Sequence, residues 1–112
     1  MRIDVRPRKR NAPRPRWKVA KAFHQWLRGR PCLIGGDCEG PMQACHVDYA
    51  GDKGMGTKVS DRFAVPMCAA HHAESHEQGV QTFEAKHRVN LLAAANAYWA
   101  KWPGRHEWEQ SQ

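Results

Sequence analysis

Two adjacent metal-ligand patterns occupy the stretch Cys68-Ala-Ala-His71-His72-Ala-Glu-Ser-His76. Cys68 and His71 have the C-x-x-H spacing of half a tetrahedral zinc site, in which a turn at the start of a helix points both ligands at one ion. His72 and His76 lie four residues apart, so on a helix they share one face and can hold a second ion. Because a helix turns about 100° per residue, the adjacent His71 and His72 can serve different centres.

The ligands that complete the first centre are expected upstream. Cys32 and Cys38 are separated by Leu-Ile-Gly-Gly-Asp, a spacing wider than the usual two to four residues. The pair Gly35-Gly36 allows a looped knuckle at this spacing. The sequence therefore predicts a structural Zn²⁺ site formed by Cys32, Cys38, Cys68 and His71.

Cysteine and histidine are concentrated in one part of the chain. All four cysteines and four of the seven histidines fall within the 45 residues from Cys32 to His76. In the cytosol such grouping favours metal binding, because that compartment keeps thiols reduced. The alternative is a secreted domain with two disulfides, for which four cysteines allow three pairings. The N-terminal residues are too basic to contain a signal peptide, which favours the metal-binding interpretation.

The residues before the ligand stretch predict two short strands joined by a glycine-rich loop. The first strand ends at His46, and the loop covers residues 51–58. Phe63, Val65 and Met67 then alternate with other residues, as they do in a strand. The ligand-bearing helix follows and ends at Gly79. The sequence therefore predicts a small α+β fold with the order strand, loop, strand, helix.

This order resembles that of the HNH, or ββα-metal, endonucleases, over about 40% of the chain, from Cys32 to His76. The stretch GMGTKVSDRFAVPMCAAHHAESH, residues 54–76, is most similar to phage and prophage HNH proteins, including the RecA-dependent Ref nuclease type. The resemblance implies a zinc-stabilised ββα-metal core flanked by an N-terminal and a C-terminal helix. It also implies metal-dependent hydrolysis of DNA phosphodiester bonds in recombination or DNA processing, with a RecA-like recombinase as a partner.

The resemblance also implies roles for single residues. His46 matches the first motif histidine, the general base that takes a proton from water. Asp61 matches the middle position, where the family often has an Asn that orients this base. His72 and His76 match the helix that binds the catalytic divalent ion, Mg²⁺, Zn²⁺, Mn²⁺ or Ni²⁺. The family often has a metal-binding Asp or His where this chain has Cys45, which is either a ligand of a soft ion or, as we favour, a buried bystander.

Positive charge is concentrated at the N-terminus. The chain has 18 Lys and Arg residues against 11 Asp and Glu, a net charge of +7, and residues 1–30 hold 11 of the basic residues and a single acidic one. Prolines and like charges predict a disordered arm over residues 1–16. Such an arm either binds DNA phosphates, as we favour, or only improves solubility. The residues assigned to nucleic acid are Arg6, Arg8, Lys9, Arg10, Arg14 and Arg16.

Two amphipathic helices are predicted beside the core. The first covers Trp17–Leu27, with His24 as a structural or surface residue and not a ligand. The second is a single long helix over residues 80–102, on which His87 lies in the core or at an interface. Residues 105–112 are expected to fray, so the predicted domain spans residues 17–104. The first-helix residues expected to pack on the second helix are Trp17, Phe23 and Trp26.

No stretch of the sequence approaches the roughly 20 apolar residues of a membrane helix. We therefore expect a chain without membrane contact in the cytoplasm of a bacterial host cell. One alternative function remains, a zinc-stabilised DNA-binding or recombination accessory module that has lost cleavage. Such a module needs its structural zinc but not His46, His72 and His76.

Overall fold

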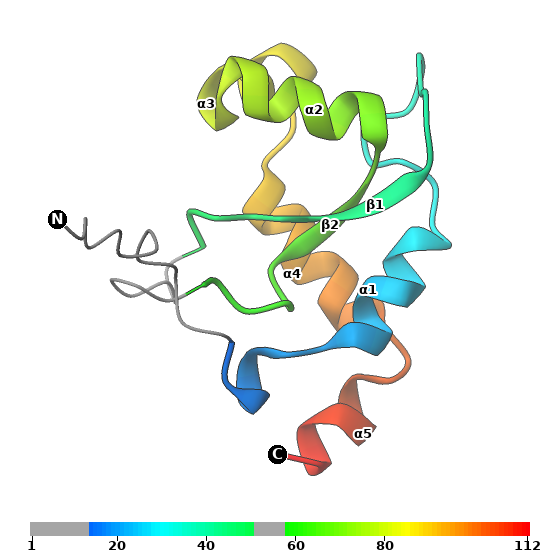
Figure 1. Cartoon of the computed structure of the whole chain (residues 1–112), viewed down its shortest axis with the longest axis vertical. Helices are drawn as coiled ribbons and strands as arrows, with labels where there is room; N and C mark the ends of the chain where they lie inside the picture. Colours follow the sequence, from blue (N-terminus) through cyan, green and yellow to red (C-terminus); the bar gives the residue numbers. More distant parts are fainter. Residues whose placement is uncertain (1–13, 51–57) are drawn as a thin grey trace, which may run out of the picture.

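The computed structural model describes residues 14–50 and 58–112, and within these ranges the chain forms a small α+β fold. The α+β prediction is confirmed, and most of the basic arm and the glycine-rich loop lie outside the described residues. No helix in these ranges is long and apolar enough to cross a membrane. The elements, seen in Figure 1, are η1 (Arg16–Lys18), α1 (Lys21–Arg28), β1 (Met42–His46), β2 (Ala64–Cys68), α2 (Ala69–Gln78), α3 (Val80–His87), α4 (Leu91–Lys101) and α5 (Arg105–Gln110).

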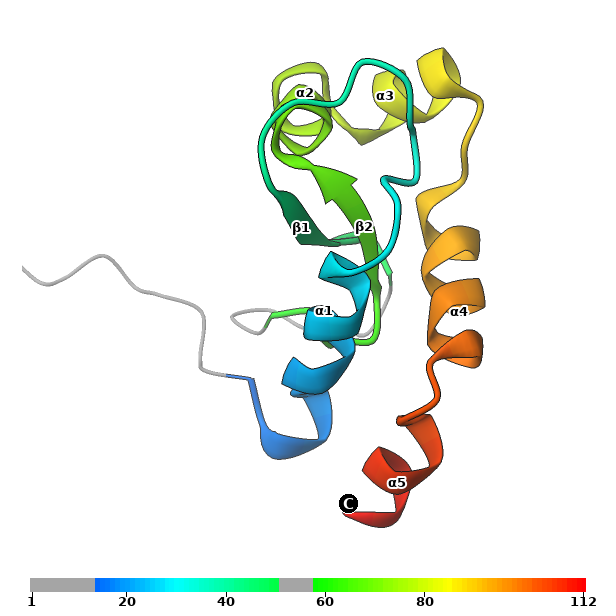
Figure 2. The same ribbon diagram turned by 90° about the vertical axis from the view of Figure 1, so that its right-hand side faces the viewer.

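The two strands form an antiparallel sheet in which Met42 pairs with Cys68 and His46 pairs with Ala64. All five residues of β2 are buried, so the alternation expected around Val65 and Met67 does not produce an exposed face. The reason is that α1 and α4 both pack against this strand (Figure 2). The strand continues directly into α2, so the ligand-bearing helix is fixed to the sheet.

The predicted first helix is divided into η1 and α1. Phe23 is fully buried, with its ring edge-on to Trp99 at 5.0 Å between centroids, and Trp26 lies 6.4 Å from Tyr98. These contacts confirm that the first helix packs on the C-terminal helices. The prediction is wrong for Trp17, which is 55% exposed. Trp17 precedes the helix and belongs to η1, so it does not share the buried face of α1.

The single helix predicted over residues 80–102 is also wrong, because α3 and α4 are separate helices. Arg88 adopts a left-handed backbone conformation with φ 54°, which ends α3. Asn90 then caps α4, since its side chain accepts a hydrogen bond from the Ala93 N–H at 2.9 Å. The break lets residues of both helices, Phe83 and Leu91, enter one core cluster with Val65 and Met67 of β2.

The C-terminal residues form a helix where fraying was predicted. α5 covers Arg105–Gln110, and its Trp108 anchors it to the rest of the fold. The indole N–H of Trp108 donates to the Val19 carbonyl at 2.7 Å, and its ring stands edge-on to Trp99 at 5.1 Å. A short helix of this kind is stable only through such tertiary contacts.

Replacing Trp108 with Ala should lower the free energy of unfolding by about 2 kcal/mol, because it removes both the indole packing and a hydrogen bond. The matched control is Trp17→Ala, which removes an indole that is 55% exposed and should change stability by less than about 0.5 kcal/mol. Urea denaturation of both variants measures the difference. Equal effects from the two substitutions would contradict the anchoring role of Trp108.

Candidate functional site

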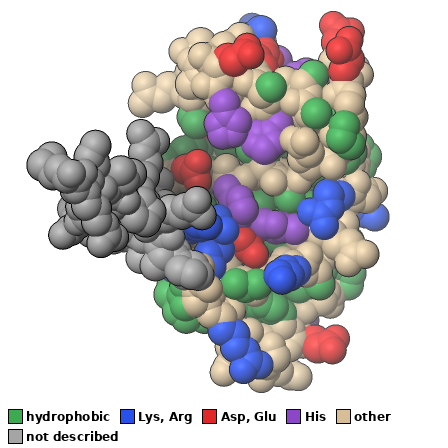
Figure 3. All heavy atoms as spheres, in the orientation of Figure 1, with side chains coloured by type: hydrophobic (Ala, Val, Ile, Leu, Met, Phe, Trp, Pro, Cys, Tyr) green, Lys and Arg blue, Asp and Glu red, His purple; other side chains and the backbone are tan. Residues whose placement is uncertain are grey.

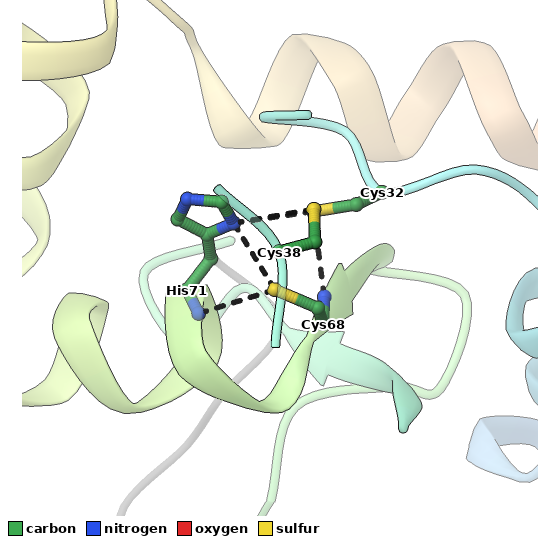
Figure 4. A group of neighbouring side chains, drawn as sticks. All are labelled: Cys32, Cys38, Cys68 and His71. Carbon is green, nitrogen blue, oxygen red and sulfur yellow. Dashed lines mark hydrogen bonds between the residues drawn. The ribbon is translucent and has the colours of Figure 1, made fainter. Parts of the chain in front are cut away.

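Three cysteines and one histidine meet at the junction of β2 and α2, as Figure 4 shows. The sulfur atoms of Cys32, Cys38 and Cys68 and Nδ1 of His71 all lie within 4.8 Å of one another. Nδ1 of His71 is 3.5 Å, 3.8 Å and 3.1 Å from the three sulfur atoms in that order. A tetrahedral zinc ion with ordinary bond lengths places nitrogen and sulfur ligands about 3.6 Å apart. The site can therefore hold a metal such as zinc, and the residues predicted for it are brought together.

Local backbone geometry forms this site. Gly35 and Gly36 both have φ near +73°, a conformation that glycine adopts without strain, and they turn the loop between the first two cysteines. At the other half of the site, the Cys68 sulfur accepts the His71 backbone N–H at 3.4 Å as the N-cap of α2. Burial opposes ionisation of Cys32, but hydrogen bonds from three backbone N–H groups, that of Cys68 among them, lower the pKa of its thiol to about 6. A thiolate is the form that binds a metal.

A second group is centred on Asp61, which the structure brings into contact with His46. Nε2 of His46 donates a hydrogen bond to Oδ1 of Asp61 at 2.9 Å. The other carboxylate oxygen accepts the Ala20 N–H at 2.9 Å. Burial by itself raises the pKa of Asp61, but the hydrogen bonds from His46 and Ala20 outweigh burial and hold this pKa below its ordinary value. Asp61 is therefore an ionised carboxylate, 6% exposed, that fixes the orientation of the His46 ring.

Two residues that the sequence analysis did not assign to this group also contact Asp61. Nε2 of His24 donates to the Asp61 backbone carbonyl at 2.8 Å, and the His24 ring lies 4.8 Å from that of His46. Burial lowers the pKa of His24 although Asp61 opposes this, so the ring is neutral at pH 7. Nε of Arg14 lies 3.3 Å from Oδ1 of Asp61 and donates to the Val59 carbonyl at 2.7 Å.

The donor atoms of His24, His46 and Asp61 also lie within 4.8 Å of one another, a spacing that can hold a metal. In the structure, however, hydrogen bonds already connect them: Nε2 of His46 to the Asp61 carboxylate and Nε2 of His24 to the Asp61 carbonyl. The hydrogen-bonded arrangement satisfies the buried carboxylate without an ion, so we interpret this group as a positioned histidine and its supports.

The two histidines of α2 form a third group. His72 and His76 lie on one face of the helix with ring centroids 4.8 Å apart. Nδ1 of His72 donates to the Gln43 side-chain carbonyl at 2.7 Å, which leaves its Nε2 lone pair free. Burial lowers the pKa of His72, and the nearby His76 and His46 lower it further. His72 is therefore a neutral imidazole, the form that binds metal.

His46 is close enough to the histidine pair to act on His72 electrostatically. Figure 3 shows histidine side chains gathered on one face of the molecule, with Lys and Arg side chains beside them. The His46 side chain is 26% exposed and His76 is exposed, so a large substrate can reach this face.

Cys45 does not belong to the site. It is 3% exposed and lies in the core cluster with Val65 and Met67. Its thiol donates to the His46 carbonyl at 3.7 Å, and burial raises its pKa to about 12. These observations favour the bystander interpretation, because Cys45 lies in the hydrophobic core and outside both groups of possible metal ligands among the described residues.

The residues assigned to nucleic acid are only partly described. Arg6, Arg8, Lys9 and Arg10 lie outside the described residues. Arg14 is directed at Asp61, and Nη2 of Arg16 donates to the Ser111 carbonyl at 3.1 Å. The end of the predicted arm is thus attached to the domain, and Arg14 belongs to the Asp61 group.

The fold and the site define a small α+β protein with a Cys₃His centre that can hold a metal such as zinc, beside a face rich in histidine. The chain belongs to the family described as "Protein of unknown function (DUF968)", which matches residues 4–100. It is 37% identical over 79 residues to "Uncharacterized protein YdfU" of Escherichia coli (strain K12). That alignment covers 70% of this chain and 21% of YdfU, so the chain spans about a fifth of that relative. No solved structure matches the chain.

Proposed function

We propose that this protein is a metal-dependent endonuclease of the HNH type that hydrolyses phosphodiester bonds in DNA. The observation that carries the proposal is the hydrogen bond from His46, at the end of β1, to the buried and ionised Asp61, with His46 close enough to His72 of α2 to act on it electrostatically. A histidine oriented by a carboxylate is a common form of general base.

The hydrogen bond assigns a role to each nitrogen of His46. Because Nε2 carries the proton donated to Asp61, Nδ1 holds a lone pair and can accept a proton from water. The negative charge of Asp61 then stabilises the imidazolium that forms. His24 and Arg14 hold Asp61 in place, so they act as positioning residues for the base.

His72 and His76 are the residues that would hold the catalytic ion. A divalent ion bound there would supply positive charge to the phosphate oxygens. The hydrogen bond to Gln43 selects the tautomer of His72 in which Nε2 keeps the lone pair that would bind the ion. Two imidazole ligands suit Zn²⁺ or Ni²⁺ better than Mg²⁺ or Mn²⁺, which prefer oxygen ligands.

The Cys₃His centre has a structural role in this proposal. All four of its ligand positions come from the protein, which leaves no open position for a substrate. Its zinc ion would connect the loop that carries Cys32 and Cys38 to the junction of β2 and α2. The centre therefore holds α2, and with it His72, against the sheet.

Nicking of supercoiled plasmid with Mg²⁺, Mn²⁺, Ni²⁺ and Zn²⁺ in parallel, together with metal analysis of the purified chain, tests the proposal. We expect one retained zinc per chain and nicking that depends on an added divalent ion. The double substitution His72→Ala/His76→Ala should abolish the nicking and leave the retained zinc in place. One tightly held zinc without nicking under any of these conditions would instead indicate a DNA-binding or recombination accessory module.

A further inference from the structure

A cavity of about 600 Å³ lies next to the Asp61 group and has no role in the proposed chemistry. Ser60, Arg62 and Phe63 line it, whereas the Asp61 carboxylate between them is directed at His46. One turn, closed by a hydrogen bond from the Phe63 N–H to the Ser60 carbonyl at 3.1 Å, therefore borders both the cavity and the histidine site. A ligand in the cavity would lie beside the candidate base.

The cavity has a wall of tryptophan rings. Trp99 and Trp108 stand edge-on to each other at 5.1 Å, and the hydrogen bond from Trp108 to the Val19 carbonyl fixes this arrangement. Trp17 lines the same cavity and is 55% exposed, the largest exposed fraction of any large hydrophobic residue that the structure describes. η1, which carries Trp17, lies at the same end of the molecule as α5 in Figures 1 and 2. The exposed face of the Trp17 indole therefore offers an apolar surface for stacking next to the two fixed rings.

Positive groups accompany these rings. The guanidinium of Arg62 lies 5.2 Å from the Trp99 ring centroid and 5.3 Å from that of Phe63. The ammonium of Lys18 lies 5.1 Å from the Trp17 ring centroid, but Lys18 is buried, does not line the cavity and donates to the Lys58 carbonyl at 3.0 Å, so it serves to hold Trp17 in place. Nε of Arg105 is buried without a hydrogen-bond partner among the described residues, and the Glu109 carboxylate lies 3.8 Å from it. Aromatic faces next to guanidinium groups are the features with which proteins bind single-stranded nucleic acid.

We propose that this cavity binds an unpaired nucleotide of single-stranded DNA, with the base stacked on Trp17 and its phosphate at Arg62. A base inside a duplex has both faces covered by its neighbours and cannot stack on an indole, so the cavity would select DNA with an unpaired base. The inference rests on the proposed function, since it names the substrate class that the histidine site would cleave. The turn over residues 60–63 would connect recognition of the unpaired base to cleavage.

Binding is measured by fluorescence anisotropy of a labelled 20-nucleotide oligothymidine, on full-length protein carrying His46→Ala and without an added divalent ion, so that cleavage during the measurement is negligible. Adding Trp17→Ala should weaken binding about tenfold, because one base–aromatic stack is lost. Trp17→Phe keeps an aromatic face and should bind within about twofold of the parent. Tyr49→Ala, which removes an aromatic residue that is 45% exposed and outside the cavity, should leave the affinity unchanged.

Arg62→Gln provides a second, independent variant. It should reduce the slope of log Kd against log salt concentration by about 0.7, the value for one phosphate contact on a single strand, whereas Trp17→Ala should leave that slope unchanged. Binding of a blunt duplex of the same length should not respond to Trp17→Ala. Zinc content and the thermal melt of each variant, compared with the parent, verify that it is folded.

The inference is overturned if Trp17→Ala binds the oligothymidine as tightly as the parent, or if it weakens duplex binding equally. These outcomes are separate from the test of the proposed function, because binding is measured without turnover. If the wild type nicks plasmid but Trp17→Ala does not weaken oligothymidine binding, the cavity assignment alone is overturned. If Trp17→Ala weakens oligothymidine binding but the wild type does not nick plasmid, the cavity assignment is supported and the proposed endonuclease function is overturned.

Discussion

The substitution Cys68→Ser is expected to release the zinc ion and leave the chain largely unfolded at 25 °C. Structural zinc sites supply roughly 10 kcal/mol or more of folding free energy. That is comparable to the whole stability of a small domain, about 5–15 kcal/mol. Cys68 is the most critical ligand, because it is 1% exposed and is both the last residue of β2 and the N-cap of α2. Metal analysis and thermal melts followed by far-UV circular dichroism measure both effects.

The matched control for this substitution is Cys45→Ala. Cys45 is also a buried cysteine in a strand, but it lies in the hydrophobic core and outside the metal cluster. We expect this variant to keep its zinc and to lose only about 1 kcal/mol of stability. If Cys68→Ser retained zinc and melted with the parent, the structural role of the Cys₃His centre would be refuted.

The second large effect is expected from His46→Ala, which should lower the rate of plasmid nicking by about 10²- to 10⁴-fold, the usual contribution of a general base. Asp61→Asn should also slow nicking, because an amide can donate a hydrogen bond to His46 and stabilise the wrong tautomer. Rates are measured under single-turnover conditions with saturating divalent ion. Both variants should retain their zinc, since neither residue belongs to the Cys₃His group.

His106→Ala is the control for the loss of a histidine. His106 is exposed on α5 and does not belong to the histidine groups of the site. Its removal should leave the nicking rate within about twofold of the parent, as expected for a surface substitution. A His46→Ala protein that nicks as fast as the parent would remove His46 from the role of base.

The features that could be predicted from the sequence are those fixed by short-range geometry. The spacing of Cys68 and His71 is determined by one helical turn, and the position of His46 by the end of the first predicted strand. The glycine pair before Cys38 similarly indicated the loop. These residues lie where the sequence predicts them, because the position of each depends on only a few neighbours in the chain.

The features that could not be predicted depend on contacts between distant residues. His24 and Arg14 meet Asp61 across 37 and 47 residues of sequence, and no local pattern specifies such a meeting. The break between α3 and α4 is an exception, because it has a local signal that the periodicity of residues 80–102 obscured: Asn90 before an apolar run is a typical helix N-cap. The anchoring of α5 by Trp108 depends on Val19, at the other end of the chain.

The direct passage from β2 into α2 has a practical consequence. His71 closes the Cys₃His centre, and the next residue, His72, belongs to the pair that would hold the catalytic ion. A single peptide bond thus joins the two sets of ligands. A chelator that strips the cysteine-bound ion would also misplace His72, so chelator inhibition would report collapse of the scaffold as much as loss of the catalytic ion.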